Sequence, residues 1–281
     1  VKINLPKNHV SFKVTNMKKQ ERISRKINRF LKRMGCPRWF HQFGPKKYEF
    51  KQHVFALLMK EVMKSSFRRC CLILDGLGFD IPTYSALCKC RKRIPISLWN
   101  ILLKLTGNSN DYFIAVDSTG FSRTNPSFHY IKRINSKKPI KSYAKLSAFF
   151  NLATRKFTAI KVSRKPRHDV KDVNYLLQMS LPKAKLFGDS AYDTESIHER
   201  CFELKIQTMF KPKVNARKGF YRRKQMKNYD DEEYPQRNGI EAGFGSLKRK
   251  YGGNVSGKFC RSVRTEVFCK AIAHNLNLTL A

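Results

Sequence analysis

Hydrophobic positions follow two different periods along the chain, and the change between them divides the sequence into two parts. Up to about residue 107, apolar residues recur at the spacing of amphipathic helices, and we predict helices over 47–65, 82–93 and 96–105. After the Gly- and Asn-containing stretch 107–111, short apolar runs typical of strands take over. The change of period therefore predicts a mostly helical N-terminal domain, residues 1–108, followed by a second domain, residues 109–281.

The second part predicts three strands, then a helix, a strand, a helix, a strand and two closing helices. The expected strands are 112–116, 143–152, 156–162, 184–187 and 206–210, and the expected helices are 170–179, 194–204, 234–248 and 263–280. This order is typical of an α/β fold with a mixed sheet and flanking helices. We find no internal repeat and no low-complexity segment.

The N-terminal part is rich in Lys and Arg. Residues 1–34 predict a basic arm that passes into a short helix. Further on, a helix, a turn containing Gly76 and Gly78, and a basic helix that includes 88–93 follow one another. That order permits a DNA-binding helix-turn-helix, and it equally permits an ordinary small helical bundle. Both interpretations stay open from the sequence.

Charge narrows the class of partner. The chain carries 58 Lys and Arg against 20 Asp and Glu, a formal net charge of +38. Such an excess favours a polyanionic partner, most often nucleic acid, with a general RNA-binding protein as the least specific alternative. We expect no membrane association, because no apolar run approaches 20 residues and no basic amphipathic helix is flanked by lipidation signals.

Cysteine usage and the N-terminus predict a reducing compartment. The eight cysteines form no Cys-x2-Cys pair, so we expect free thiols and no structural zinc. The sequence begins without an apolar signal region, so we expect a cytoplasmic protein.

The segment 234–248 places one carboxylate among two cations and a phenol. Counted from Glu241, Arg237 is four residues back, Tyr234 seven back and Lys248 seven ahead. At about 100° per residue, all four fall within roughly 60° on one face of a helix. Three glycines in the same segment, at 239, 243 and 245, have no explanation in the sequence.

Two further acids follow apolar runs directly. Asp117 comes after Phe-Ile-Ala-Val and Asp189 after Lys-Leu-Phe-Gly, so each is expected at a strand end, where a carboxylate can meet a ligand. Capping of the following turn is an equally good explanation for either one alone. Turn capping is the better explanation for Asp75, and helix capping is expected of Asp169 and Asp193.

These residues together resemble one group of DDE transposases from bacterial and archaeal insertion sequences. The group's signature of four spaced residues is matched by Tyr234, Arg237, Glu241 and Lys248. The motifs Asp117-Ser-Thr-Gly and Gly-Asp189-Ser-Ala-Tyr-Asp stand where the group has its first two acids. The resemblance covers residues from about 110 to the C-terminus and extends more loosely to 77–88.

The resemblance implies a ribonuclease-H-like catalytic domain. Asp117 and Asp189 would lie on adjacent strands with Glu241 on a helix across the sheet, and the three would bind two Mg²⁺ or Mn²⁺ ions. Arg237 and Lys248 would hold DNA phosphates, and Tyr234 would contact a nucleotide at the cleaved end.

The implied reaction is hydrolysis at transposon ends, followed by attack of the freed 3′-hydroxyl on target DNA. Double-stranded DNA is the implied partner, with a homodimer or larger assembly to hold two ends in a nucleoid-associated, prokaryotic protein.

One departure from the group is the short distance between the second and third acids. Only 51 residues separate Asp189 from Glu241, so the large inserted domain of some relatives is absent. We interpret the basic segment 211–227 within this interval as a DNA-contacting loop. A structure-selective nuclease of the same fold and an inactive, domesticated DNA-binding relative remain the alternatives to an active transposase.

Overall fold

A computed structural model describes residues 7–41, 43, 46–107, 112–123, 143–164, 167–214 and 218–280, with the backbone alone for 7–18 and 280. The N-terminal helices are α1 (Lys7–Arg33), α2 (Phe50–Val62), α3 (Phe67–Gly76), α4 (Tyr84–Arg93) and α5 (Ile96–Gly107). The strands are β1 (Phe113–Arg123), β2 (Tyr143–Asn151), β3 (Lys156–Ser163), β4 (Lys185–Gly188), β5 (Gln207–Phe210) and β6 (Asn254–Val255). The later helices are α7 (Val170–Met179), α8 (Glu195–Glu203), α9 (Phe220–Met226), α10 (Asn238–Tyr251) and α11 (Cys260–Leu280), with short 3-10 turns η1 (Ser190–Tyr192) and η2 (Tyr234–Arg237).

The strands form one mixed sheet in the order β3-β2-β1-β4-β5, with the two-residue β6 paired to the end of β1. Strands β1, β2 and β3 are antiparallel neighbours, whereas β4 runs parallel to β1 and β5 runs parallel to β4. Parallel neighbours require a crossover, and α7 and α8 supply the two crossovers. The α/β layout with a mixed sheet, as in ribonuclease-H-like folds, is confirmed.

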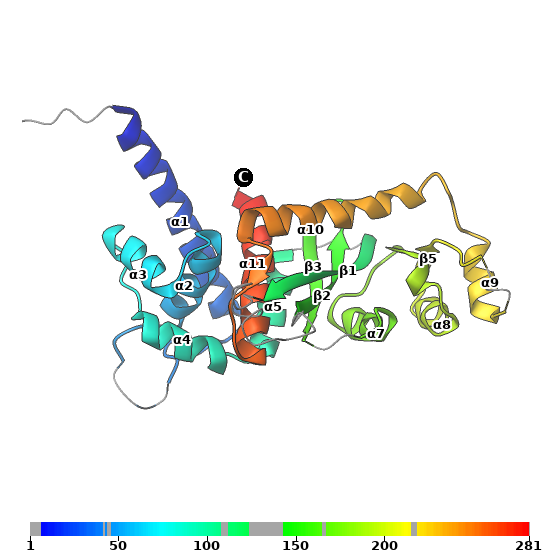
Figure 1. The fold of residues 1–281 in the computed structure, drawn as a ribbon, viewed down its shortest axis with the longest axis horizontal. Coiled ribbons are helices and arrows are strands. Elements are labelled where there is room, and N and C mark those ends of the chain that lie inside the picture. The colour runs from blue at the N-terminus through cyan, green and yellow to red at the C-terminus, as the bar shows by residue number, and fades with distance from the viewer. Residues whose placement is uncertain are drawn as a thin grey trace, which may run out of the picture.

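Helices cover both faces of the sheet, because the strands alternate their apolar side chains (Figure 1). On β1, Ile114 and Val116 pack with α7 and α8, while Ala115 and Phe121 face the opposite side. That opposite side is covered by α5, α10 and α11. Asp117 and Thr119 share the period of Ala115, so the sequence itself directs them towards α10.

The N-terminal helices and the sheet share a continuous apolar core along α11. Beside it lies a cluster of buried ion pairs: Lys60 on α2 meets Glu61 at 2.8 Å and Glu266 of α11 at 3.4 Å, and Lys270 meets Glu61 at 3.4 Å. Removal of one partner from such a cluster leaves a buried charge uncompensated, which costs about 3–5 kcal/mol.

The domain boundary expected between residues 108 and 109 stays a prediction, because residues 108–111 lie outside the described part.

Two N-terminal segments differ from expectation. The expected short helix after a basic arm is the 27-residue helix α1, whose described last turns bury Ile23, Ile27 and Leu31 against the core. Residues 70–74, expected only as an apolar run before a turn, belong to α3, whose N-terminus Ser66 caps by accepting the Arg69 N–H. The succession of α3, a turn and the basic helix α4 is therefore present. No helix in the described ranges combines the length and apolarity needed to span a bilayer.

The interpretation of 211–227 as a loop is wrong for its last part, which forms α9. The carboxylate of Glu195 accepts the N–H groups of Tyr221 and Arg222 and so fixes the first turn of this helix. The Arg222 side chain donates to buried Asp193 at 2.7 Å from both Nε and Nη2. Residues 215–217 lie outside the described ranges.

Two of the three unexplained glycines let α10 approach the sheet closely. A Cβ added to Gly243 would lie 2.6 Å from the ring of Phe150 on β2, and one on Gly239 would lie 2.8 Å from Leu152. Phe150 is 2% exposed and has no room to move aside. Gly245 differs, because nothing lies within 4 Å of its Cβ position.

We predict opposite effects of two matched substitutions in this one helix. Gly243→Ala forces Phe150 and α10 apart and lowers the free energy of unfolding by about 1–3 kcal/mol. Gly245→Ala meets open space and raises it by about 0.5–1 kcal/mol, because Ala has the higher helix propensity. Denaturant unfolding of both variants measures the difference, and equal effects would contradict the packing described.

Candidate active site

Strand register brings the first two acids together. Ala115 of β1 is paired with Phe187 of the parallel strand β4, so Asp117 and Asp189, two residues further on, stand at the same level. The expectation that Asp117 ends its strand is wrong. β1 continues to Arg123 because β2 pairs with it as far as Ser122, whereas β4 ends at Gly188. Because β4 stops at Gly188 while β1 continues, no strand of the sheet pairs with this edge of β1 directly beyond the two acids.

Each of these carboxylates uses one oxygen locally. Asp117 Oδ1 accepts the Ser118 N–H at 2.7 Å, and Asp189 Oδ1 accepts the Ala191 N–H at 2.8 Å as the cap of η1. The capping role considered for Asp189 is therefore present. A cap occupies only part of a carboxylate's hydrogen-bonding capacity, so capping does not exclude a ligand.

The segment 234–248 brings the third acid to this pair. It begins as the 3-10 turn η2 and continues as α10, which differs from the single helix expected. The Arg237 guanidinium donates from Nη2 to Glu241 Oε1 at 2.7 Å, and its Nη1 lies 3.7 Å from Asp117 Oδ2. One cation thus bridges the β1 acid and the α10 acid.

Lys248 and Tyr234 lie on either side of this bridge. Lys248 Nζ donates to Thr119 Oγ1 on β1 at 2.6 Å and stands 5.8 Å from the ring centre of Phe121. Burial raises the pKa of the Tyr234 phenol, and Asp189 and Glu241 act in the same direction against Arg237. All six residues of the predicted site therefore interact with one another or with β1.

The electrostatics of the site favour a further cation. Burial raises the pKa of Asp117 to about 6, and the charges of Asp189 and Glu241 add to the rise, while the Ser118 N–H and Arg237 oppose it. A carboxyl group whose pKa is raised this far lacks sufficient positive charge around it. Glu241 keeps 56% of its side chain exposed, so it can change partner with little packing cost.

The donor set consists of carboxylates, which suits Mg²⁺ or Mn²⁺ better than zinc. Within the described ranges no three His, Cys, Asp or Glu side chains are arranged so as to hold a metal ion. In this structure the Arg237 guanidinium is the cation that lies between Asp117 and Glu241. The chemistry of the donors fits a divalent ion, and the ligand assignment stays a prediction.

Sequence reasoning missed a polar layer behind the acids. Ser118 Oγ donates to Asp169 at 2.7 Å, and Asp169 is also ion-paired with buried Lys145 of β2. Asp169 occupies the N-cap position of α7, but its side chain makes no capping hydrogen bond, so the capping role expected of it is absent. The motif Asp117-Ser-Thr was the available signal, because Ser118 and Thr119 alternate to opposite faces of β1.

The capping role expected of Asp193 is wrong. Its side chain is buried and accepts hydrogen bonds from Arg222, from His198 at 2.9 Å and from the Lys213 N–H at 2.8 Å. His198 lies on α8, Arg222 lies on α9, and Lys213 lies in the segment between β5 and α9. Asp193 therefore holds these three segments together. Thr194 occupies the N-cap position of α8 instead.

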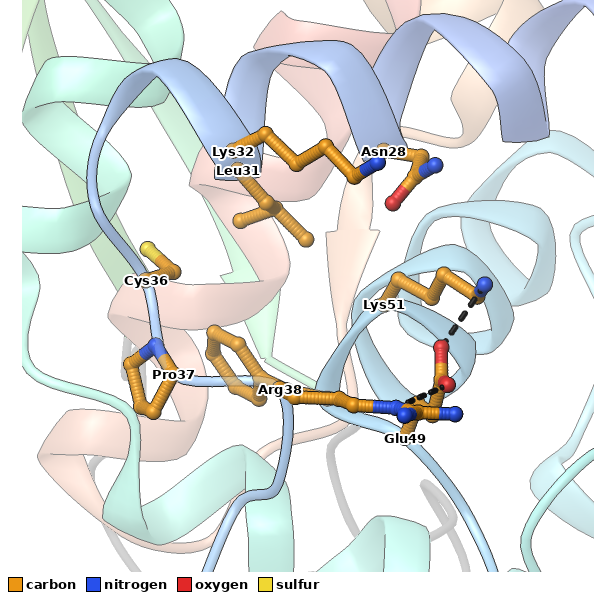
Figure 2. A pocket seen from close by; sticks show the side chains of 9 residues that line it. Asn28, Leu31, Lys32, Cys36, Pro37, Arg38, Glu49 and Lys51 are labelled. Atoms are coloured by element: carbon orange, nitrogen blue, oxygen red, sulfur yellow. Dashed lines mark hydrogen bonds and ion pairs between the residues drawn. The ribbon is translucent and has the colours of Figure 1, made fainter.

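A separate hollow of about 350 Å³ lies in the N-terminal region, between the end of α1 and the start of α2 (Figure 2). Its one acid, Glu49, is already paired with Arg38 at 2.6 Å and Lys51 at 2.7 Å. Glu49 also forms a capping box with Gln52 at the start of α2. These charges stabilise the local fold, and the hollow is distinct from the three acids.

Comparison with known families identifies the chain. The family model described as the transposase DDE domain matches residues 108–276. The chain belongs to this DDE transposase family. The resemblance found in the signature residues is thus confirmed, and with it the assignment to the proteins of transposition.

Among solved structures, the piggyBac transposase in a synaptic complex with hairpin DNA aligns with a TM-score of 0.51 and 11% identity, over 89% of this chain and 70% of that one. At this identity the match shows a shared fold. Mos1 transposase, in a paired-end complex with the left transposon end, aligns over 82% of this chain and 88% of its own with 11% identity, but its TM-score of 0.25 adds nothing to the fold assignment. No curated protein matches the sequence.

The raised pKa of Asp117 predicts a pH-dependent stability. Its folded pKa of about 6 lies above the ordinary value of 3.8, so the folded protein binds more protons between them and loses stability as pH rises from about 4 to 6. Without divalent ions, Asp117→Asn is therefore expected to gain about 3 kcal/mol of stability relative to the parent between pH 4 and pH 7, with the gap closing below pH 4. Urea unfolding in EDTA across this range measures it, and a gap independent of pH would contradict the electrostatic account.

Proposed function

We propose that the chain is an active DNA transposase, which cuts the ends of its element by metal-dependent hydrolysis and joins the freed 3′-hydroxyl to target DNA. The observation that carries the proposal is the placement of Asp117 and Asp189 at one level of two parallel strands, with Glu241 tied to Asp117 through Arg237. Membership of the DDE transposase family supports the same reaction class.

Asp117, Asp189 and Glu241 are the residues proposed to hold divalent ions, two in number and either Mg²⁺ or Mn²⁺. Such ions activate an attacking oxygen and stabilise a leaving one in phosphoryl transfer. The protein residues fix the geometry: β1 and β4 set the spacing of the two aspartates, and α10 presents Glu241 from across the sheet.

Arg237 is proposed to exchange partners when DNA binds. Its guanidinium now pairs with two carboxylates through one nitrogen each, and a phosphate can accept from both nitrogens in a bidentate geometry. Transfer of Arg237 to a DNA phosphate would release Glu241 to join Asp117 and Asp189. Exposure of Glu241 permits that movement without a change in the backbone.

The remaining signature residues are proposed to position the DNA. Lys248 lies beside β1 through Thr119, where its ammonium can meet a phosphate next to the acids. Tyr234 presents a phenol on η2 and would contact the nucleotide at the cleaved end. Because the chain carries a formal net charge of +38, its affinity for DNA should fall steeply as the salt concentration is raised.

The N-terminal region, residues 1–108, is proposed to bind the inverted repeats. In α4, Lys89, Lys92 and Arg93 are exposed, as a helix that enters a DNA groove requires. Because two ends must be held together, we propose a homodimer or larger assembly on double-stranded DNA, in the nucleoid of a prokaryotic cell.

We predict that Asp117→Asn, Asp189→Asn and Glu241→Gln each lower DNA cleavage by more than about a hundredfold, because each removes a ligand of ions that contribute several kcal/mol to the reaction. The assay measures nicking, in Mg²⁺, of duplex DNA that carries the repeats flanking the gene. Glu203→Gln, which removes an exposed acid paired with Arg200 on α8, is the matched control and should cleave normally. Full cleavage by any of the three site variants would refute the assignment.

The same assay separates the alternatives. A structure-selective nuclease would cut without joining, so strand transfer of a pre-cut end into plasmid DNA distinguishes it from a transposase. An inactive DNA-binding relative would bind the repeats without Mg²⁺ and leave them intact.

A further inference from the structure

A second concave surface lies on the far flank of α10 from the three acids. It is a groove of about 550 Å³ between α10, the end of α11 and the turn that joins β2 to β3. Figure 1 shows α10 lying across the strands with its last turns beside α11. At about 100° per residue, Ser246 in the wall of the groove lies roughly 140° around the helix from Glu241. The groove is therefore distinct from the candidate active site, although both use the same helix.

The groove is lined by basic and small side chains. Arg155 lines one side, and Arg249 and Lys250 line the other, and all three are exposed. None of the described residues that line it is an Asp or Glu. Ala242 and Ser246 form part of the α10 wall, so small side chains leave room for a ligand between the cations. Three cations without a neighbouring acid predict an anionic occupant.

Arg155 is held at the mouth of the groove in a conformation that is unusual for its residue type. Its φ is 55°, in the left-handed region that favours glycine. The buried ring of His274 on α11 lies with Nε2 3.0 Å from the Arg155 carbonyl oxygen. Because a carbonyl only accepts, Nε2 carries the proton and donates. The turn between β2 and β3 sets this backbone conformation, and the hydrogen bond from His274 holds the Arg155 backbone at the mouth of the groove.

The outer ridge of α10 between the two sites is also low. Gly245 and Ala242 are exposed on this ridge, and no atom lies within 4 Å of the Gly245 Cβ position. A strand bound at Glu241 can therefore pass over the helix towards Arg249 without a bulky side chain in its path.

We propose that this groove, lined by Arg155, Arg249 and Lys250, is a second DNA-binding site that takes the sugar-phosphate backbone of the duplex as it leaves the active site across α10. The inference rests on the proposed function, because DNA is the anion that the neighbouring site binds. A basic arm of a second copy of this chain would be repelled by the same cations.

The test compares two exposed cations that share a backbone conformation. Lys205 has a φ of 58°, close to that of Arg155, and lies outside both sites, at the end of α8. Arg155→Glu and Lys205→Glu change the net charge equally, so their difference reports the groove alone. Binding of a mixed-sequence DNA duplex to the full chain is measured by fluorescence anisotropy in EDTA, which prevents cleavage, over a series of salt concentrations.

We expect Arg155→Glu to weaken duplex binding about tenfold and to make the dependence of log K on log salt less steep by about one, whereas Lys205→Glu has much the smaller effect. Arg155→Gly removes the cation and suits the left-handed backbone, so it should also weaken binding while the Tm stays equal or rises. This variant separates lost contact from lost folding.

Equal effects of Arg155→Glu and Lys205→Glu would overturn the proposal. If Arg155→Glu abolished binding of poly-glutamate but left duplex binding unchanged, the groove would belong to an acidic protein partner and the proposal would also fail. Neither result would affect the cleavage assay on Asp117 and Glu241, so failure of this inference is distinguishable from failure of the proposed function.

Discussion

The close packing of α10 on β2 determines the geometry of the site. Gly243 lies against the ring of Phe150, and Phe244 stacks on Phe157 with ring centres 5.9 Å apart. Rigid aromatic contacts of this kind fix the height and rotation of the helix over the sheet. Glu241 and Lys248 project from that helix and Arg237 immediately precedes it, so their distances from β1 follow from this one interface.

The second constraint is electrostatic. The sheet places two aspartates at one level, and burial of Asp117 raises its pKa to about 6, so positive charge must be supplied from elsewhere. Arg237 supplies part of it by pairing with Asp117 and Glu241. In the proposed function, a divalent ion would compete with the guanidinium for these carboxylates, and a DNA phosphate would compete with the carboxylates for the guanidinium. DNA binding would thereby act directly on the acids.

Glycine in α10 serves two separate purposes. Gly239 and Gly243 face the sheet and permit contact, whereas Gly245 faces outward and leaves the ridge of the helix low. Each weakens the helix intrinsically, since glycine costs about 1 kcal/mol relative to alanine. The inward pair offsets this cost by packing. The outward one has no packing partner among the described residues, which accords with a surface kept open for a ligand.

The sequence alone determined most of the elements and the members of the site. Apolar periodicity is a local property, so it predicted the order of strands and helices, and the spacing of Tyr234, Arg237, Glu241 and Lys248 selected four residues of one signature, although the first two lie on η2 and only the last two on α10. It also selected Asp117 and Asp189, because acids directly after apolar runs stand out among so few carboxylates. Predictions from local sequence pattern were wrong where a residue's pairing or hydrogen-bond partners come from distant segments of the chain.

Only the tertiary structure decided those cases, because register and packing depend on pairs of residues far apart in the chain. β1 runs on past Asp117 since β2 pairs with it, and Asp193 is buried since Arg222, 29 residues later, binds it. The conformation of Arg155 is supported by His274, 119 residues away. Neither the contact of Gly243 with Phe150 nor the bridge from Arg237 to Asp117 has a local signal, and these two contacts bring the predicted residues into one site.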